Sequence, residues 1–154
     1  MDSTTELKRR ACAAIDASRD QIIGLGEEIM RNPETGFREF KTEARVVETM
    51  EELGLSPSRG LAVTGAKAML KSNNSGPTLA LIGELDSLCI PDHPFADKET
   101  GAAHACGHNA QIAGMLGAAI GLIRGEVGEA LGGDIAFFAV PAEEMIEIGY
   151  SMGL

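Results

Sequence analysis

The chain has 154 residues, of which 44% are hydrophobic and 23% charged, a composition typical of a globular domain with its own core. Its net charge is −10, so nucleic-acid phosphates would repel it and we expect no nucleic-acid partner. No stretch reaches the roughly 18 apolar residues of a membrane span, so we expect no membrane partner either.

The cysteines and the N-terminus indicate where the protein resides. Cys12, Cys89 and Cys106 are an odd number of widely spaced cysteines, which is not the pattern of a disulfide framework. The first residues lack the basic and apolar regions of a signal peptide. Both features favour a reducing compartment, and we predict a cytoplasmic protein.

Two helices are expected first in the chain. Apolar residues recur at helical spacing over residues 4–31, which predicts one long amphipathic helix ended by Asn32-Pro33. A second apolar stripe over residues 42–53 predicts another helix, with Gly54 as its stop signal.

The remainder of the chain alternates between strands and helices. The apolar run 61–70 is interrupted by Ala and Gly, and its state is left open. Residues 79–82 and 135–140 are continuously apolar and predict strands buried on both faces. Residues 87–103 predict a long loop, and a helix begins near Gly107. This alternation predicts an α/β fold, a sheet covered on both sides.

Chemically active residues follow these predicted elements. Acidic residues come directly after both apolar strands, and a Cys-Gly-His sequence opens the later helix. Ligands of α/β sheets bind outside the carboxyl ends of the strands. We therefore expect five side chains to converge on one place: Asp86, Cys106, His108, Glu143 and Glu144.

The motif HACGH at residues 104–108 concentrates two of three histidines and one of three cysteines in five positions. Thiolate, imidazole and carboxylate are together the ligands of divalent metals, and zinc is the usual occupant. The dipole of the following helix favours a thiolate at Cys106. A metal with an open coordination position activates water. Of Glu143 and Glu144, one could bind the metal and the other act as the general base.

Other interpretations of the same residues stay open at this point. Cys106 could be a nucleophile with His104 or His108 as its base, or a buried core residue. Asp86 could be an ordinary turn residue, and the Glu-Glu pair a solvated surface.

Four segments, taken together, resemble one known family. They are NPETGFREFKTEARVVETMEELGL (32–55), GELDSL (83–88), TGAAHACGHNAQIAGMLGAAIGL (100–122) and VPAEE (140–144). In this order they resemble the amidohydrolase branch of the aminoacylase and carboxypeptidase-G type zinc metallopeptidases. Hippurate, aminobenzoyl-glutamate and indole-acetyl-amino-acid hydrolases belong to that branch.

The resemblance implies a three-layer α/β/α zinc-peptidase catalytic domain with a mixed sheet. It implies hydrolysis of an amide bond in an N-acyl amino acid or small peptide, with Zn or Mn, or else Ni or Co. By motif, Cys106, His108 and Glu144 would be metal ligands and Glu143 the general acid/base. Asp86 would orient a ligand imidazole.

The sequence departs from the family pattern in three positions. Family members often have Asp and His where this chain has Asn109 and Gln111, and Asp where it has Glu84. A role carried by the family's histidine is therefore in doubt here.

The largest departure is length. The resemblance implies two further histidine ligands downstream and an inserted domain that forms homodimers, but the chain has no His after 108 and stops at Leu154. We therefore expect residues 1–154 to be the N-terminal part of the catalytic domain. The alternative is a catalytically inactive fragment or a non-catalytic binding module of the same fold.

Overall fold

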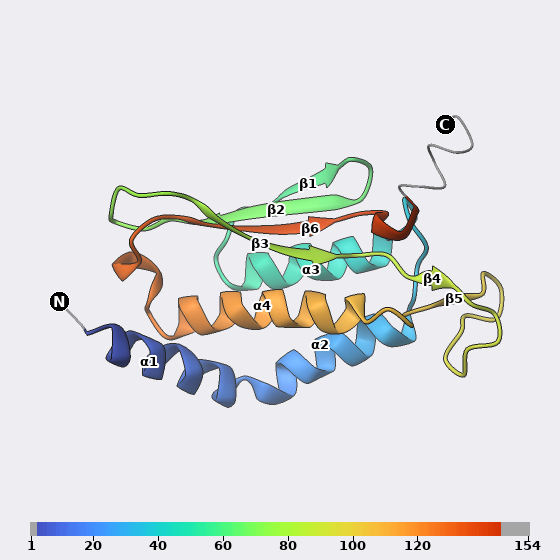
Figure 1. The fold of residues 1–154 in the computed structure, drawn as a ribbon, viewed down its shortest axis with the longest axis horizontal. Coiled ribbons are helices and arrows are strands. Elements are labelled where there is room, and N and C mark those ends of the chain that lie inside the picture. Colours follow the sequence, from blue (N-terminus) through green and yellow to red (C-terminus); the bar gives the residue numbers. More distant parts are fainter. Residues whose placement is uncertain (1–2, 146–154) are drawn as a thin grey trace.

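The computed structural model describes residues 3–145 (Figure 1). Its helices and strands, in chain order, are α1 (Thr4–Ala17), α2 (Arg19–Arg31), α3 (Phe40–Glu52), β1 (Ser58–Leu61), β2 (Gly65–Leu70), β3 (Leu79–Glu84), β4 (Leu88–Cys89), β5 (Ala102–Ala103), α4 (His108–Arg124) and β6 (Ile135–Val140). Two short 3-10 turns, η1 (Gly128–Ala130) and η2 (Glu143–Met145), flank β6.

The main sheet is mixed and has the strand order β1-β2-β6-β3. β6 is the last strand within residues 3–145 but lies inside the sheet, antiparallel to β2 and parallel to β3. The parallel register places Glu84 opposite Val140, so β3 and β6 end side by side. The predicted α/β class with a mixed sheet is confirmed.

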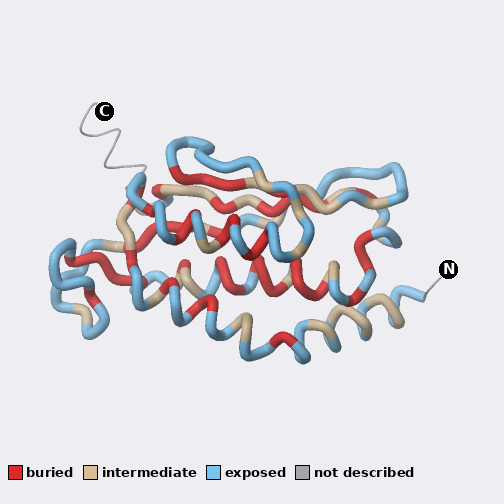
Figure 2. Tube along the Cα trace, turned by 180° about the vertical axis from the view of Figure 1, so that it is seen from behind, coloured by how far each residue is buried: buried red, intermediate tan, exposed pale blue. Residues whose placement is uncertain are grey.

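The helices form two layers on one face of the sheet (Figure 1). α3 and α4 contact the strands, whereas α1 and α2 pack against α4. Figure 2 shows the buried segments concentrated along α4, the inner side of α3, and the strands β2 and β6. The core joins these layers through fully buried side chains such as Leu25, Met50, Leu116 and Phe137. β3 packs closely on α4 at Gly83, where a Cβ would lie 2.8 Å from Ile112 Cδ1.

The single long helix predicted over residues 4–31 is wrong in one respect. The helix is interrupted at Ser18, which ends α1 and precedes α2. The Ser18 hydroxyl accepts a hydrogen bond from Arg124 at the end of α4 (2.9 Å). The break lets both halves pack along α4, where Ile15 contacts Gly121 and Ile22 contacts Gly117.

Burial of residues 79–82 on both faces is also a wrong prediction. β3 lies at an edge of the sheet, and Leu79 and Ile82 are 60% and 57% exposed. Gly83 packs against α4, so its neighbour Ile82 points to the other face of the sheet, and in Figures 1 and 2 the four helices of the described region all lie on the α4 side. Continuous apolar sequence therefore marks a strand here, but it does not report which of its faces is covered.

The remaining predictions agree with the structure. β6 is buried along most of its length, and α4 begins at His108. Residues 61–70 belong to the β1–β2 hairpin, and 87–103 form a loop that also carries the short strands β4 and β5. Within residues 3–145, none of the helices is long and apolar enough to cross a membrane.

The exposed edge of β3 predicts self-association of the chain. An unpaired strand edge with apolar side chains is a template for another strand, and a charge there opposes pairing. We expect Ile82→Lys to raise the concentration at which the purified chain self-associates by about tenfold. Light scattering after gel filtration measures this, with Ile23→Lys on α2 as a matched control at another exposed isoleucine (44%). Equal effects of both substitutions would contradict a role for the β3 edge.

Candidate metal centre

The structure brings the five predicted side chains together at the carboxyl end of the β3–β6 pair. Asp86 follows β3, while Glu143 and Glu144 open the turn after β6. His108 is the first residue of α4, and Cys106 lies two residues before it. The sequence-based expectation of convergence rested on strand polarity, and the parallel pairing of β3 with β6 is what produces it.

His108 is the central side chain of this cluster and is 4% exposed. Its Nδ1 lies 2.9 Å from the backbone oxygen of Asp86 and 3.4 Å from Asp86 Oδ1. Its Nε2 faces the carboxylates of Glu84 (2.9 Å), Glu144 (3.8 Å) and Glu143 (3.9 Å). A proton on Nδ1, donated to Asp86, therefore leaves the Nε2 lone pair directed at the acidic cluster.

Asp86 holds two parts of the site in register. Its side chain is fully buried, and Oδ2 accepts a hydrogen bond from the Glu144 backbone N–H (2.9 Å). Oδ1 has no hydrogen-bond partner in the described part of the chain and faces only the His108 ring. Asp86 thus fixes both the imidazole and the turn that carries the Glu-Glu pair.

Glu39 is a second buried carboxylate behind this turn, and sequence reasoning missed it. Its Oε1 accepts the N–H of Ala142 (2.8 Å), and its Oε2 accepts the hydroxyl of Thr64 (2.6 Å). Ala142 has a left-handed backbone (φ 57°), which costs energy for a residue with a Cβ and is held by this contact. A glutamate just before a helix is usually exposed, where it interacts favourably with the helix dipole. Nothing in the sequence distinguished Glu39 from such an exposed glutamate.

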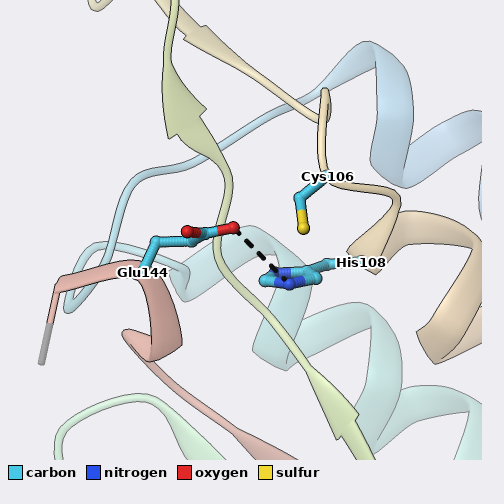
Figure 3. Close-up of side chains that lie close together, drawn as sticks. All are labelled: Cys106, His108 and Glu144. Carbon is cyan, nitrogen blue, oxygen red and sulfur yellow. Dashed lines mark ion pairs between the residues drawn. The ribbon is translucent and has the colours of Figure 1, made fainter.

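The donor set fits a divalent cation. One donor atom from each of Cys106, His108 and Glu144 lies within 4.8 Å of the others. Figure 3 shows the Cys106 sulfur and the Glu144 carboxylate directed toward the His108 ring from different segments. A second set with the same spacing consists of Glu84, His108 and Glu143. Sulfur, imidazole nitrogen and carboxylate oxygen are ligands of zinc and related ions.

Negative charge accumulates at this cluster. The charge of Glu84 raises the pKa of Glu143, with burial and Glu144 adding to the effect. A hydrogen bond with Glu144, and secondarily burial, raises the pKa of Cys106. The expected thiolate is therefore not favoured in the absence of a cation, because the nearby carboxylates raise the pKa of the thiol. A bound cation would reverse that balance.

His104 does not serve Cys106 as a base in this structure. The ring is 9% exposed, and neither of its nitrogens has a hydrogen-bond partner within residues 3–145. Burial, with the charge of His108 as a second cause, lowers the pKa of His104 to about 4. Together with the raised pKa of Cys106, this arrangement disfavours a cysteine nucleophile activated by His104.

Asn109 and Gln111, whose roles the sequence left open, make different contacts. The Asn109 amide donates to the backbone oxygen of Gly26 (3.1 Å) and so ties α4 to α2. The Gln111 amide bonds to Glu84 on β3.

Residues 80–153, which include all five predicted site residues, match the family described as Peptidase family M20/M25/M40. Over this stretch, which is just under half of its length, the chain is similar to a domain of that peptidase family. Thermostable carboxypeptidase 2 of Saccharolobus solfataricus is 32% identical over 148 residues, covering 88% of this chain and 37% of the carboxypeptidase. N-acetyl-L-cysteine deacetylase of Bacillus subtilis is 34% identical over 127 residues, covering 80% of this chain and 30% of the deacetylase.

A solved structure of the M20 family agrees with the fold. The YxeP protein of Bacillus subtilis, described as a dinuclear metal-binding peptidase, superposes with a TM-score of 0.73 at 29% identity. The match covers 90% of this chain and 41% of YxeP. The chain thus spans well under half of the length of these M20 relatives.

We expect removal of the buried Glu39 carboxylate to lower the stability of the protein measurably. Glu39→Ala leaves the Ala142 N–H and the Thr64 hydroxyl without their acceptor, and we expect a loss of about 2–4 kcal/mol in the free energy of unfolding. Glu39→Gln keeps one acceptor oxygen and should lose less. Urea denaturation measures both, and Glu52→Ala on the exposed side of α3 is the control, with a change below about 0.5 kcal/mol. Equal stability of Glu39→Ala and the control would contradict the positioning role.

Proposed function

We propose that this chain is the metal-binding part of a hydrolase that cleaves an amide bond of an N-acyl amino acid or small peptide. The observation that carries the proposal is the convergence of Cys106, His108 and Glu144 at one end of the sheet. M20 relatives support metal-dependent amide hydrolysis, among them a carboxypeptidase and a deacetylase. The acyl group and the amino acid of the substrate are not specified by the described residues.

The geometry supports the following roles for the individual residues. Cys106, His108 and Glu144 hold the cation, and Asp86 fixes His108 so that Nε2 faces it. When bound, the divalent cation supplies Lewis-acid activation of water and of the substrate carbonyl. Glu143 accepts the proton of the attacking water and delivers it to the leaving amine. The charge of Glu84 raises the pKa of Glu143 above the ordinary carboxyl value, which favours proton uptake by this group.

Zn and Mn are the ions that we propose first, with Ni or Co as alternatives, because a thiolate, imidazole and carboxylate set accepts all four. The three cysteines are free, which accords with a reducing, cytoplasmic compartment. We propose a small-molecule substrate, no nucleic-acid or membrane partner, and a homodimer for longer relatives of this chain.

The competing proposal is a chain of this fold that binds a cation without catalysis. The two donor sets within residues 3–145 share the same histidine, His108. These residues can therefore supply a histidine ligand to one ion at most. A metal-loaded chain that hydrolyses none of a panel of N-acyl amino acids and dipeptides would favour this alternative.

Metal stoichiometry tests the centre directly. We expect the purified chain to carry close to one equivalent of Zn or Mn by elemental analysis. Cys106→Ser should lower the retained metal at least about tenfold, because a soft thiolate ligand is lost. Cys89→Ser, at an exposed free cysteine outside the cluster, is the matched control and should retain the metal. Metal retained in Cys106→Ser would count against the assigned ligand set.

Glu143 separates catalysis from metal binding. In a metal-loaded protein that hydrolyses an N-acyl amino acid, Glu143→Gln should reduce kcat by about 10²–10⁴-fold, because the proton acceptor is removed. The metal content should stay unchanged, since Glu143 is not one of the proposed ligands. A parallel loss of metal and activity would instead assign Glu143 to the coordination sphere.

A further inference from the structure

Among the carboxylates that face His108 Nε2, Glu84 makes the shortest contact. Its Oε2 lies 2.9 Å from Nε2, compared with 3.8 Å for Glu144 and 3.9 Å for Glu143. The side chain is 23% exposed and belongs to the last residue of β3. Glu84 therefore occupies the space directly in front of the nitrogen that the metal centre uses.

The separation of these two atoms matches that of neighbouring ligands of one ion. A nitrogen and an oxygen that are each about 2.1 Å from a zinc ion lie about 3.0 Å apart at a right angle, and about 3.4 Å apart at the tetrahedral angle. Glu84 Oε2 and His108 Nε2 are at 2.9 Å. The observed separation is close to these values, so both atoms can coordinate the same cation with only a small movement.

Gln111 holds Glu84 in this position. The Gln111 amide nitrogen donates to Glu84 Oε2 (3.0 Å), and its amide oxygen accepts the Glu84 backbone N–H (2.5 Å). Gln111 lies three residues after His108 on α4, so both side chains project from the same side of the helix. One helix thus carries the imidazole and the amide that orients the carboxylate facing it.

We propose that Glu84 is a ligand of the cation bound through His108 Nε2, and that Gln111 positions Glu84 for that role. The inference rests on the proposed metal centre and adds a fourth protein ligand to Cys106, His108 and Glu144. The described residues then supply one thiolate, one imidazole and two carboxylates to a single divalent ion. An ion that expands to five-coordinate, as zinc can, keeps a position for water beside these four protein ligands.

If Glu84 instead competes with the cation for His108, the opposite effect on metal affinity is expected. A carboxylate that only accepts a hydrogen bond from a protonated Nε2 competes with the cation for His108. Its removal would then strengthen metal binding. The direction of the change in affinity therefore distinguishes a ligand from a competitor.

The test is isothermal titration of the metal-free 154-residue chain with zinc chloride, alongside the absorption spectrum of the cobalt(II)-substituted chain. We expect Glu84→Gln, which has the same shape without the charge, to weaken zinc binding at least about tenfold. Glu84→Asp keeps the charge but is one methylene shorter, and it should weaken binding comparably if direct coordination matters. Both should alter the ligand-field bands of bound cobalt.

Two further variants complete the design. Gln111→Leu removes the amide that orients Glu84, and it should weaken zinc binding by a smaller factor, about three- to tenfold. Glu52→Gln, an exposed glutamate on α3, removes the same charge far from the cluster and should leave the affinity unchanged. Circular dichroism of each variant establishes that it is folded before titration.

The outcomes separate this inference from the metal centre itself. Unchanged or tighter zinc binding in Glu84→Gln, with binding still abolished in Cys106→Ser, overturns the role of Glu84 and leaves the centre intact. Full affinity in Glu84→Asp with loss in Glu84→Gln shows an effect of charge alone and also overturns it. A folded wild-type chain that binds no zinc overturns the centre and the role of Glu84 together.

Discussion

The buried carboxylate of Asp86 is the constraint on which the site depends. It sits where β3 ends, it faces His108 Nδ1 at the start of α4, and it accepts the backbone N–H of Glu144 beyond β6. Burying a carboxylate is costly unless it is compensated by such partners. Three segments that are distant in sequence are thereby held in one geometry. Glu39 supports the same turn from behind through Ala142, so the Glu-Glu pair is fixed from two sides.

The distribution of charge explains why a cation suits this place. Carboxylates meet around a single imidazole, and the charge of Glu84 already raises the pKa of Glu143. Hydrogen bonds from Gln111 to Glu84 and from the Glu144 backbone to Asp86 offset part of the repulsion, and a divalent ion would neutralise the remaining charge. Two of the three positions where the sequence departs from the family pattern, Glu84 and Gln111, bond to one another. They form one local arrangement rather than two separate changes.

Sequence patterns predicted the class of the fold and the membership of the cluster. Strand polarity was sufficient to bring Asp86, His108 and Glu144 together, because carboxyl ends of parallel strands share an edge. The break at Ser18 was not predictable from periodicity, since the apolar stripe continues through it and only packing on α4 requires the bend. Burial of β3 was misjudged, because apolar sequence does not reveal what covers a strand. Glu39 was missed because its partners are distant in sequence.

The position of β6 has a consequence for how the chain folds. The last strand of the sheet inserts between β2 and β3, which are made much earlier. Long-range strand pairing is slow, because the intervening chain loses conformational entropy before the strands make stabilising contacts. During synthesis, His108 emerges from the ribosome before Glu144, and until β6 is in place β3 lacks its parallel partner. The donors of the proposed metal centre therefore come together only once β6 has paired with β3.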